Sequence, residues 1–128
     1  LVLSGKVDLT LGLSRPEAAN KVIIDLKSGN PSPLHRDDLR FYALLETIKL
    51  GIPPRMLATY YLDAARPQPE DVTVDLLWSA ARRAVDGARA IIELGEGRRP
   101  VKRPGPPCRW CPVSAECPEG QAFLADEL

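Results

Sequence analysis

The segment from Val22 to Ser28 constrains the fold of this 128-residue chain more than any other segment. It reads VIIDLKS, an apolar and β-branched run typical of a strand, and Asp25 and Lys27 lie inside it. Side chains of a strand alternate between two faces, so Asp25 and Lys27 share one face with Ile23. Burying a carboxylate and an ammonium is costly unless a partner or a metal satisfies them. The pattern therefore predicts a strand with a functional acid and base.

A second apolar run precedes this segment. Apolar and polar residues alternate within residues 7–11, so residues 1–13 are predicted to form one strand, or two short strands with a bend. Residues 14–20 are polar and are predicted to be a turn that joins the two runs in an antiparallel hairpin. This pairing would bring the carboxylates of Asp8 and Asp25 together.

The rest of the chain alternates between helix and strand patterns, which predicts an α/β fold with a small mixed β-sheet flanked by helices. A helix is predicted for 37–50 with Gly51 as its stop, and 55–62 should be an internal strand. We expect a loop at 63–71. A helix at 74–94 follows, with Thr73 as its N-cap. The apolar stripe of this helix consists of Val74, Leu77, Trp78, Ala81, Val85, Ala88 and Ile92.

The composition changes after residue 97, where Pro, Gly, Arg and Cys dominate. We therefore predict two parts, a core at 1–97 and a basic, cysteine-bearing tail at 98–128 that cannot build a regular core. Cys108, Cys111 and Cys117 have the spacing Cys-x2-Cys-x5-Cys, which indicates a metal or cluster site rather than disulfides. Zinc and a [4Fe–4S] cluster both normally take four protein ligands, so the residues leave the choice open.

Composition excludes some classes of protein. The chain has 17 basic and 17 acidic side chains, so bulk charge gives no indication of nucleic-acid binding. No apolar run reaches the roughly 20 residues that span a membrane, and we expect a cytoplasmic protein. The sequence begins with Leu1 and already reads as strand, so we expect a piece of a longer protein.

Paired carboxylates at Asp8 and Asp25 would repel each other unless a cation lay between them. Mg²⁺ suits this place because it prefers oxygen ligands and is typically held by one or two carboxylates plus substrate phosphate. The backbone carbonyl of Leu26 offers a further oxygen. Lys27 would orient an attacking water or stabilise charge in the transition state. The alternative is a solvated cross-strand ion pair.

The segments SGKVDLTLG, VIIDLKSG and DDLRFYALL, in this order, resemble the PD-(D/E)XK nuclease superfamily and its RecB-like nuclease domains. The resemblance implies a restriction-endonuclease-like core, truncated here at its amino-terminal part. It implies Asp8, Asp25 and the Leu26 carbonyl as ligands of Mg²⁺ or Mn²⁺, Lys27 as the catalytic lysine and Tyr42 as a residue near DNA. The chain departs from the family at Asp38, where many relatives have glutamine.

The activity implied by this resemblance is that of a Mg- or Mn-dependent deoxyribonuclease, an exonuclease that leaves 5′-phosphates. The context would be DNA repair, recombination or CRISPR-related processing, with a helicase or another repair or CRISPR protein as partner. The cysteines resemble those of CRISPR-associated exonucleases. In those proteins a distant upstream cysteine completes a structural [4Fe–4S] cluster, so Cys108, Cys111 and Cys117 would be three of four ligands.

A basic stretch leads to these cysteines and contains no acidic residue. Together with the aromatic Trp110 that follows, it suits a phosphate backbone and a stacked base. The predicted DNA contacts are Arg98, Arg99, Lys102 and Arg103. Solvated loop residues are the alternative for these four, and helix packing is the alternative for Tyr42. His35, in the loop just before the helix, is predicted to be solvated rather than catalytic. Two rival functions stay open: a non-catalytic DNA-binding module and a zinc-stapled interaction domain.

Overall fold

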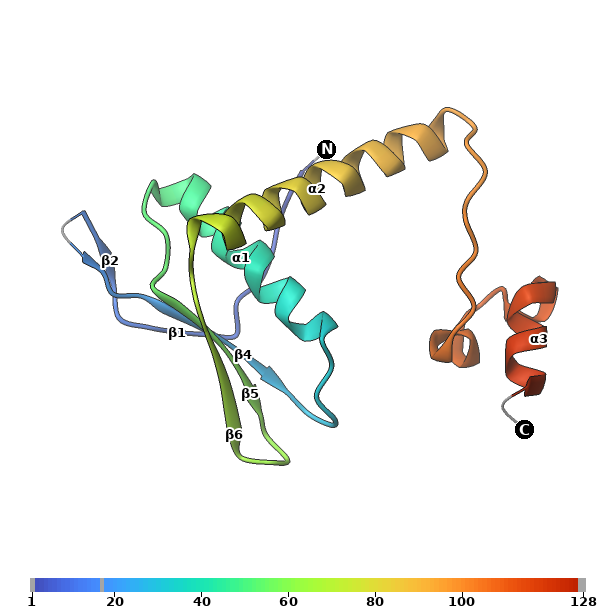
Figure 1. Ribbon diagram of the computed structural model, residues 1–128, viewed down its shortest axis with the longest axis horizontal. Coiled ribbons are helices and arrows are strands. Elements are labelled where there is room, and N and C mark those ends of the chain that lie inside the picture. Colours follow the sequence, from blue (N-terminus) through green and yellow to red (C-terminus); the bar gives the residue numbers. More distant parts are fainter. Residues whose placement is uncertain (1, 17, 127–128) are drawn as a thin grey trace. The chain divides into compact units, whose positions relative to one another are not determined.

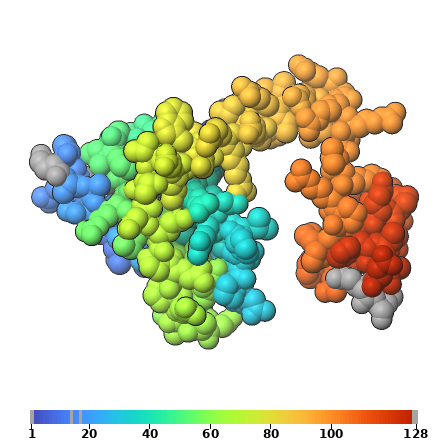
Figure 2. Space-filling view, in the orientation of Figure 1, coloured from blue at the N-terminus to red at the C-terminus, as the bar shows by residue number. Residues whose placement is uncertain are grey.

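The computed structural model describes residues 2–16 and 18–126, and Figure 1 shows how their elements follow one another. The described residues form a mixed four-stranded sheet and three α-helices, which confirms the predicted α/β class. The chain divides into two compact units, Leu1–Ile91 and Ile92–Leu128. The blue-to-yellow part of Figure 2 shows the close packing of the first unit.

The main sheet combines both pairing directions. Its strands are β1 (Leu9–Leu11), β4 (Val22–Lys27), β5 (Met56–Tyr61) and β6 (Arg66–Asp71), in the spatial order β1-β4-β5-β6. β4 pairs antiparallel with β1 and parallel with β5, and β5 pairs antiparallel with β6. The predicted hairpin and the internal position of the 55–62 strand are therefore confirmed. A separate small ladder forms within the predicted turn, between β2 (Ser14–Arg15) and β3 (Ala18–Ala19).

The predicted strand over residues 1–13 was wrong except at β1, since residues 2–8 form no strand; Leu1 lies outside the described residues. The backbone of Gly5 lies against the ring of Tyr42 on helix α1 (Leu34–Leu50), and a Cβ there would lie 2.4 Å from a ring carbon. Leu3 lines a groove beside the same helix. This segment packs along α1 instead of extending the sheet.

β6 corrects the prediction of a loop at 63–71. It contains Pro67 and Pro69, and proline cannot donate a ladder hydrogen bond. The backbone N–H of Val72 donates to Arg55 O at 3.1 Å, so the even-numbered residues of β6 point their N–H groups toward β5. Both prolines therefore point toward the outer edge, where no ladder bond is lost. An edge strand tolerates the composition that favoured a loop.

Helix α1 confirms the predicted helix at 37–50 but begins earlier, at Leu34. The backbone N–H of Leu34 donates to Ser32 Oγ at 3.3 Å. Gly51 ends the helix with φ of 71°, and its N–H donates to Thr47 O at 2.8 Å. Glycine adopts this left-handed conformation without strain, which explains the stop at this residue.

The core of the first unit lies between the sheet and α1. Ile23 and Leu57, neighbours in register on β4 and β5, are fully buried against Leu39 and Ala43 of α1. Burying a leucine or isoleucine side chain stabilises the fold by about 1.5–3 kcal/mol. The sheet face that carries Ile23 is therefore the covered face.

Helix α2 (Val74–Gly95) confirms the second predicted helix and its N-cap, because Leu76 N–H donates to Thr73 Oγ1 at 3.1 Å. Its first turns pack on the core through Leu76 and Leu77. Most of the predicted apolar stripe is exposed instead: Trp78 has an exposed fraction of 65%. The period of the pattern predicted the helix correctly but not which residues the fold covers.

The second unit contains more regular structure than its composition predicted. Two short 3₁₀ turns lead into α3 (Pro118–Asp126), which the sequence analysis did not predict. Pro118 occupies the first turn, where its missing N–H is not needed, and Glu119 adds negative charge at the positive helix end. Gly120 is the buried residue of this helix. The proline-rich composition concealed these start signals.

Candidate functional site

Strand β4 presents the predicted acid and base on the covered face of the sheet. Asp25 is 6% exposed, next to the fully buried Ile23 two residues before it. The side chain of Lys27, two residues further on, is 27% exposed at the end of the strand. Leu26 on the opposite face is exposed. The alternation predicted from the sequence is confirmed, and it places a carboxylate inside the core.

One oxygen of the Asp25 carboxylate has fewer partners than it could accept. Asp25 Oδ2 lies 3.0 Å from Lys27 Nζ. Lys27 is the one cation among the described residues that reaches this buried oxygen, and no other hydrogen-bond donor does. A carboxylate oxygen with a single partner keeps lone-pair capacity for an additional cation.

Asp8 approaches the same end of β4 from the side of β1. It is exposed, and its Oδ2 accepts a hydrogen bond from the backbone N–H of Leu26 at 3.0 Å. The register that pairs Leu9 with Ile24 would, if continued by one residue, place Asp8 opposite Asp25. In a strand the N–H and C=O of one residue point the same way, so the Leu26 carbonyl also faces the Asp8 side.

Lys27 is held as a cation by its neighbours. The contact with the Asp25 carboxylate raises the pKa of Lys27 above its ordinary 10.5; partial burial opposes this, and the charges of Asp25 and Asp38 add to the rise. Lys27 Nζ lies 3.8 Å from Asp38 Oδ2. Because the folded-state pKa is raised, the pair stabilises the fold below pH 10.5 and is lost as pH rises through the folded-state pKa. Lys27 is thus protonated at neutral pH.

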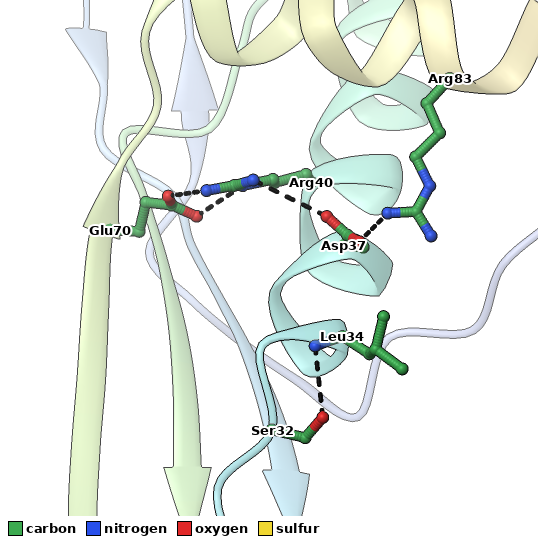
Figure 3. Close-up of polar contacts among 6 residues, drawn as sticks. All are labelled: Ser32, Leu34, Asp37, Arg40, Glu70 and Arg83. Carbon is green, nitrogen blue, oxygen red and sulfur yellow. Dashed lines mark hydrogen bonds and ion pairs between the residues drawn. The ribbon is translucent and has the colours of Figure 1, made fainter. Parts of the chain in front are cut away.

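The two adjacent acids of α1, Asp37 and Asp38, make different contacts. Figure 3 shows Asp37 between two arginines: Arg83 of α2 pairs with its Oδ2, and Arg40 Nη1 lies 3.7 Å from its Oδ1. Arg40 in turn donates to Glu70 of β6 through Nε at 3.0 Å and Nη2 at 2.5 Å. The contact with Glu70 raises the pKa of Arg40. This network ties α1 to β6 and α2, whereas Asp38 points to Lys27.

Two aromatic contacts surround this end of the sheet. Tyr42 is half-buried against the core cluster and lies beside Gly5. This is the helix-packing position that was the alternative to a DNA contact. His35 was predicted to lie in a solvated loop, and this was wrong. It lies in the first turn of α1, and its Nδ1 is 3.2 Å from the hydroxyl of the buried Tyr61. The Ser32–Pro33 start signal would have placed it in the helix.

The four basic residues predicted to contact DNA lie in the second unit and are all exposed. Arg98 pairs with Glu93, and Lys102 Nζ lies 2.7 Å from Glu119 Oε2. This contact raises the pKa of Lys102 and lowers that of Glu119. Arg99 and Arg103 have no ion pair with another described residue. The stretch without acids thus obtains two counter-ions from its flanking segments.

The three cysteines line one pocket of about 420 Å³, together with Lys102 and Arg103. A Cβ at Gly120 would lie 3.6 Å from Cys108 Sγ and 3.5 Å from Cys117 Sγ, so glycine leaves space beside two of the sulfurs. Over residues 2–16 and 18–126, no three His, Cys, Asp or Glu side chains form a group that could hold a metal ion as they stand. The thiols share a pocket without converging on one point.

Comparison of this chain with models of known protein families finds no match, and comparison with curated proteins finds no significant match. Across the described residues, no helix combines the length and apolar character needed to cross a membrane. The functional assignment therefore depends on the site itself.

Proposed function

We propose that this chain is a metal-dependent DNA nuclease of the RecB-like PD-(D/E)XK type, with a restriction-endonuclease-like core. The observation that carries the proposal is the buried Asp25 carboxylate, whose Oδ2 has the Lys27 ammonium as its one partner among the described residues. Strand residues rarely bury a carboxylate unless it is paired or binds a metal. The order of the three sequence motifs adds support.

The groups that would hold a divalent cation at this place are the carboxylates of Asp25 and Asp8 and the carbonyl of Leu26. Mg²⁺ and Mn²⁺ accept such oxygen sets and complete them with water and substrate phosphate, so a third carboxylate is not needed. The ion, when bound, would polarise the scissile phosphate and lower the pKa of an attacking water. Because Asp25 is buried and lies on strand β4, the direction of its carboxylate is fixed.

Lys27 would act as a fixed positive charge. Its ammonium group has three N–H donors and no acceptor, so it donates hydrogen bonds rather than accepting the proton of water. Its place at the end of β4, two residues from Asp25, lets it face a non-bridging phosphate oxygen. In the hydrolysis, the water oxygen bonds to phosphorus and the bond from phosphorus to the 3′ oxygen breaks. One proton of the water ends on the leaving 3′ oxygen, which becomes a hydroxyl, and the water oxygen stays on phosphorus, so the product keeps a 5′-phosphate.

The second unit would assist as a structural and DNA-contacting element. Cys108, Cys111 and Cys117 would be three of the four ligands of a [4Fe–4S] cluster or of zinc; they line one pocket, and their sulfurs would have to move together to bind one ion or cluster. Exposed Arg99 and Arg103 would contact phosphates, and exposed Trp110 would stack on a base. The protein would act in repair, recombination or CRISPR-related processing, with a helicase or similar protein as partner.

A non-catalytic DNA-binding module is the second candidate, and one observation favours it. The 3.0 Å contact between Lys27 and Asp25 is also what a purely structural ion pair would show. The two candidates differ in the response to metal. A binding module would bind DNA equally well with and without Mn²⁺ and would not cleave it.

Cleavage of labelled single- and double-stranded DNA tests the proposal directly. The chain is incubated with Mn²⁺ or Mg²⁺, beside Asp25→Asn and the control Asp86→Asn, which changes an exposed acid of α2. We expect metal-dependent products with 5′-phosphates, lost in Asp25→Asn by about 100-fold or more and kept in the control. Binding without cleavage, or equal cleavage by Asp25→Asn, would contradict the nuclease assignment.

A further inference from the structure

One buried oxygen at this site is a ligand that two cations would compete for. Asp25 Oδ2 is in contact with the Lys27 ammonium at 3.0 Å, and it is also the oxygen that the proposed divalent cation would use. Two positive charges at such a short separation repel each other strongly in a partly buried place. Metal binding at Asp25 therefore requires a second acceptor to which Lys27 can turn.

Asp38 is placed to be that acceptor. Its Oδ2 lies 3.8 Å from Lys27 Nζ, on α1 rather than on the strand. The Asp38 side chain is 58% exposed and makes no other ion pair within the part of the chain that the structure describes. Lys27 thus lies between a buried carboxylate and an exposed one.

The neighbouring acid shows that this placement is specific to Asp38. Asp37 carries the same charge on the same helix, but Arg40 and Arg83 already neutralise it, as Figure 3 shows. It holds helices together and has no contact with Lys27. Two adjacent aspartates thus provide a built-in comparison between an acid near the site and an acid outside it.

We propose that Asp38 is a positioning residue that receives the Lys27 ammonium when a divalent cation binds at Asp25. This inference rests on the proposed function. It explains why an acid at this position is compatible with a phosphate-binding site: in the metal-bound state one N–H of Lys27 pairs with Asp38, and the other N–H groups of the ammonium are left for a phosphate oxygen. Asp38 acts through Lys27 and does not itself bind the metal.

The test is a double-mutant cycle on Mn²⁺ affinity, measured by calorimetry on the full chain without DNA. An exposed ion pair changes an equilibrium constant by at most about fivefold, so Asp38→Asn should weaken Mn²⁺ binding by about that factor. Asp38→Glu, which keeps the acceptor, should restore most of the affinity. Lys27→Met removes the competing cation and should strengthen binding. In the Lys27→Met background, Asp38→Asn should have almost no further effect.

Two controls separate this effect from folding and from net charge. Asp37→Asn should lower thermal stability, because it breaks the link between α1 and α2, but should leave Mn²⁺ affinity unchanged. Asp86→Asn removes one exposed negative charge from α2 and should change neither quantity. If Lys27→Met does not fold, Lys27→Gln serves the same purpose, because its amide can still donate a hydrogen bond to Asp25.

Each outcome decides the question. Unchanged Mn²⁺ affinity in Asp38→Asn would overturn the inference while leaving the nuclease assignment intact. Equal weakening with and without Lys27 would also overturn it, since Asp38 would then act on the metal directly. Absence of Mn²⁺ binding by the wild-type chain would contradict both the inference and the proposed metal site. A fivefold effect that disappears without Lys27 supports the positioning role.

Discussion

The two units hold their candidate residues in different ways. In the first unit Asp25 and Lys27 lie on β4 and Asp8 directly precedes β1, and strand register and a covering helix fix them. In the second unit the three cysteines come from one segment, and local backbone bonds such as Cys111 N–H to Cys108 O at 3.3 Å fix them. The first unit buries leucine and isoleucine side chains completely, whereas Gly120 is the buried residue among those described in the second.

The two units therefore depend on different sources of stability. A core of apolar side chains supplies enough stabilisation to keep Asp25 buried beside Lys27. The second unit has turns and one short helix but little apolar burial, so its stability must come from somewhere else. Three thiols around one pocket are the groups that could provide it through a metal or cluster. The following predictions test this contrast.

The largest effect should come from Lys27→Ala, which removes the fixed charge of the first unit. Loss of one preorganised charge donor typically lowers the rate by about 10²–10³-fold, and we expect a loss of this size in single-turnover DNA cleavage. Circular dichroism should show that the variant stays folded. Cleavage at the wild-type rate would remove Lys27 from the mechanism.

Leu57→Ala tests whether the apolar core belongs to the first unit alone. Leu57 is fully buried on β5, and truncation of such a leucine costs about 2–5 kcal/mol of unfolding free energy, which urea denaturation can measure. Leu34→Ala, at an exposed leucine, is the matched control and should cost less than about 0.5 kcal/mol. Reaction of the three thiols with a disulfide reagent should not change. Faster thiol reaction in Leu57→Ala would show that the units are not independent.

Cys111→Ser tests whether a metal ion or cluster held by the cysteines stabilises the second unit. In protein reconstituted with iron and sulfide, or with zinc, the variant should melt at least about 5 °C lower, because one ligand of the cluster or ion is lost. Absorbance in the sulfide-to-iron bands would identify a cluster, and metal analysis would identify zinc. An unchanged melting temperature in reconstituted protein would mean that the thiols stabilise nothing.

The smallest effect should appear in the salt dependence of DNA binding. Arg103→Ala and Arg99→Ala should each reduce the slope of log affinity against log salt by about 1, since neither arginine has an ion pair among the described residues. Lys102→Ala should reduce it less, because Glu119 already neutralises this lysine. A salt response that is flat in the wild-type chain would exclude these residues from the DNA interface.

The sequence predicted the parts of the fold that depend on strong periodicity. β4, β5 and both long helices follow from their apolar patterns, and the Gly51 stop follows from glycine chemistry. β6 could not be predicted because its two prolines are tolerated only at a sheet edge, and edge position is a property of the whole sheet. Residues 2–8 likewise follow α1 for a tertiary reason, the close contact of Gly5 with Tyr42.

The candidate site was likewise predictable only where it depends on local periodicity. Alternation along one strand predicted that Asp25 and Lys27 share a face, since this needs only local geometry. The contact of Lys27 with Asp38 and that of His35 with Tyr61 join a helix to the sheet, so no sequence period contains them. Both contacts depend on how α1 packs over the sheet.

The decisive experiment measures Mn²⁺ binding to the wild-type chain and to Asp25→Asn by electron paramagnetic resonance of the free ion. Asparagine keeps the shape of Asp25 but removes the charge that would hold the ion. We predict one Mn²⁺ bound per wild-type chain and an affinity loss of about tenfold or more in Asp25→Asn. Equal binding by the two proteins would contradict the assignment of Asp25 as the metal ligand of a nuclease.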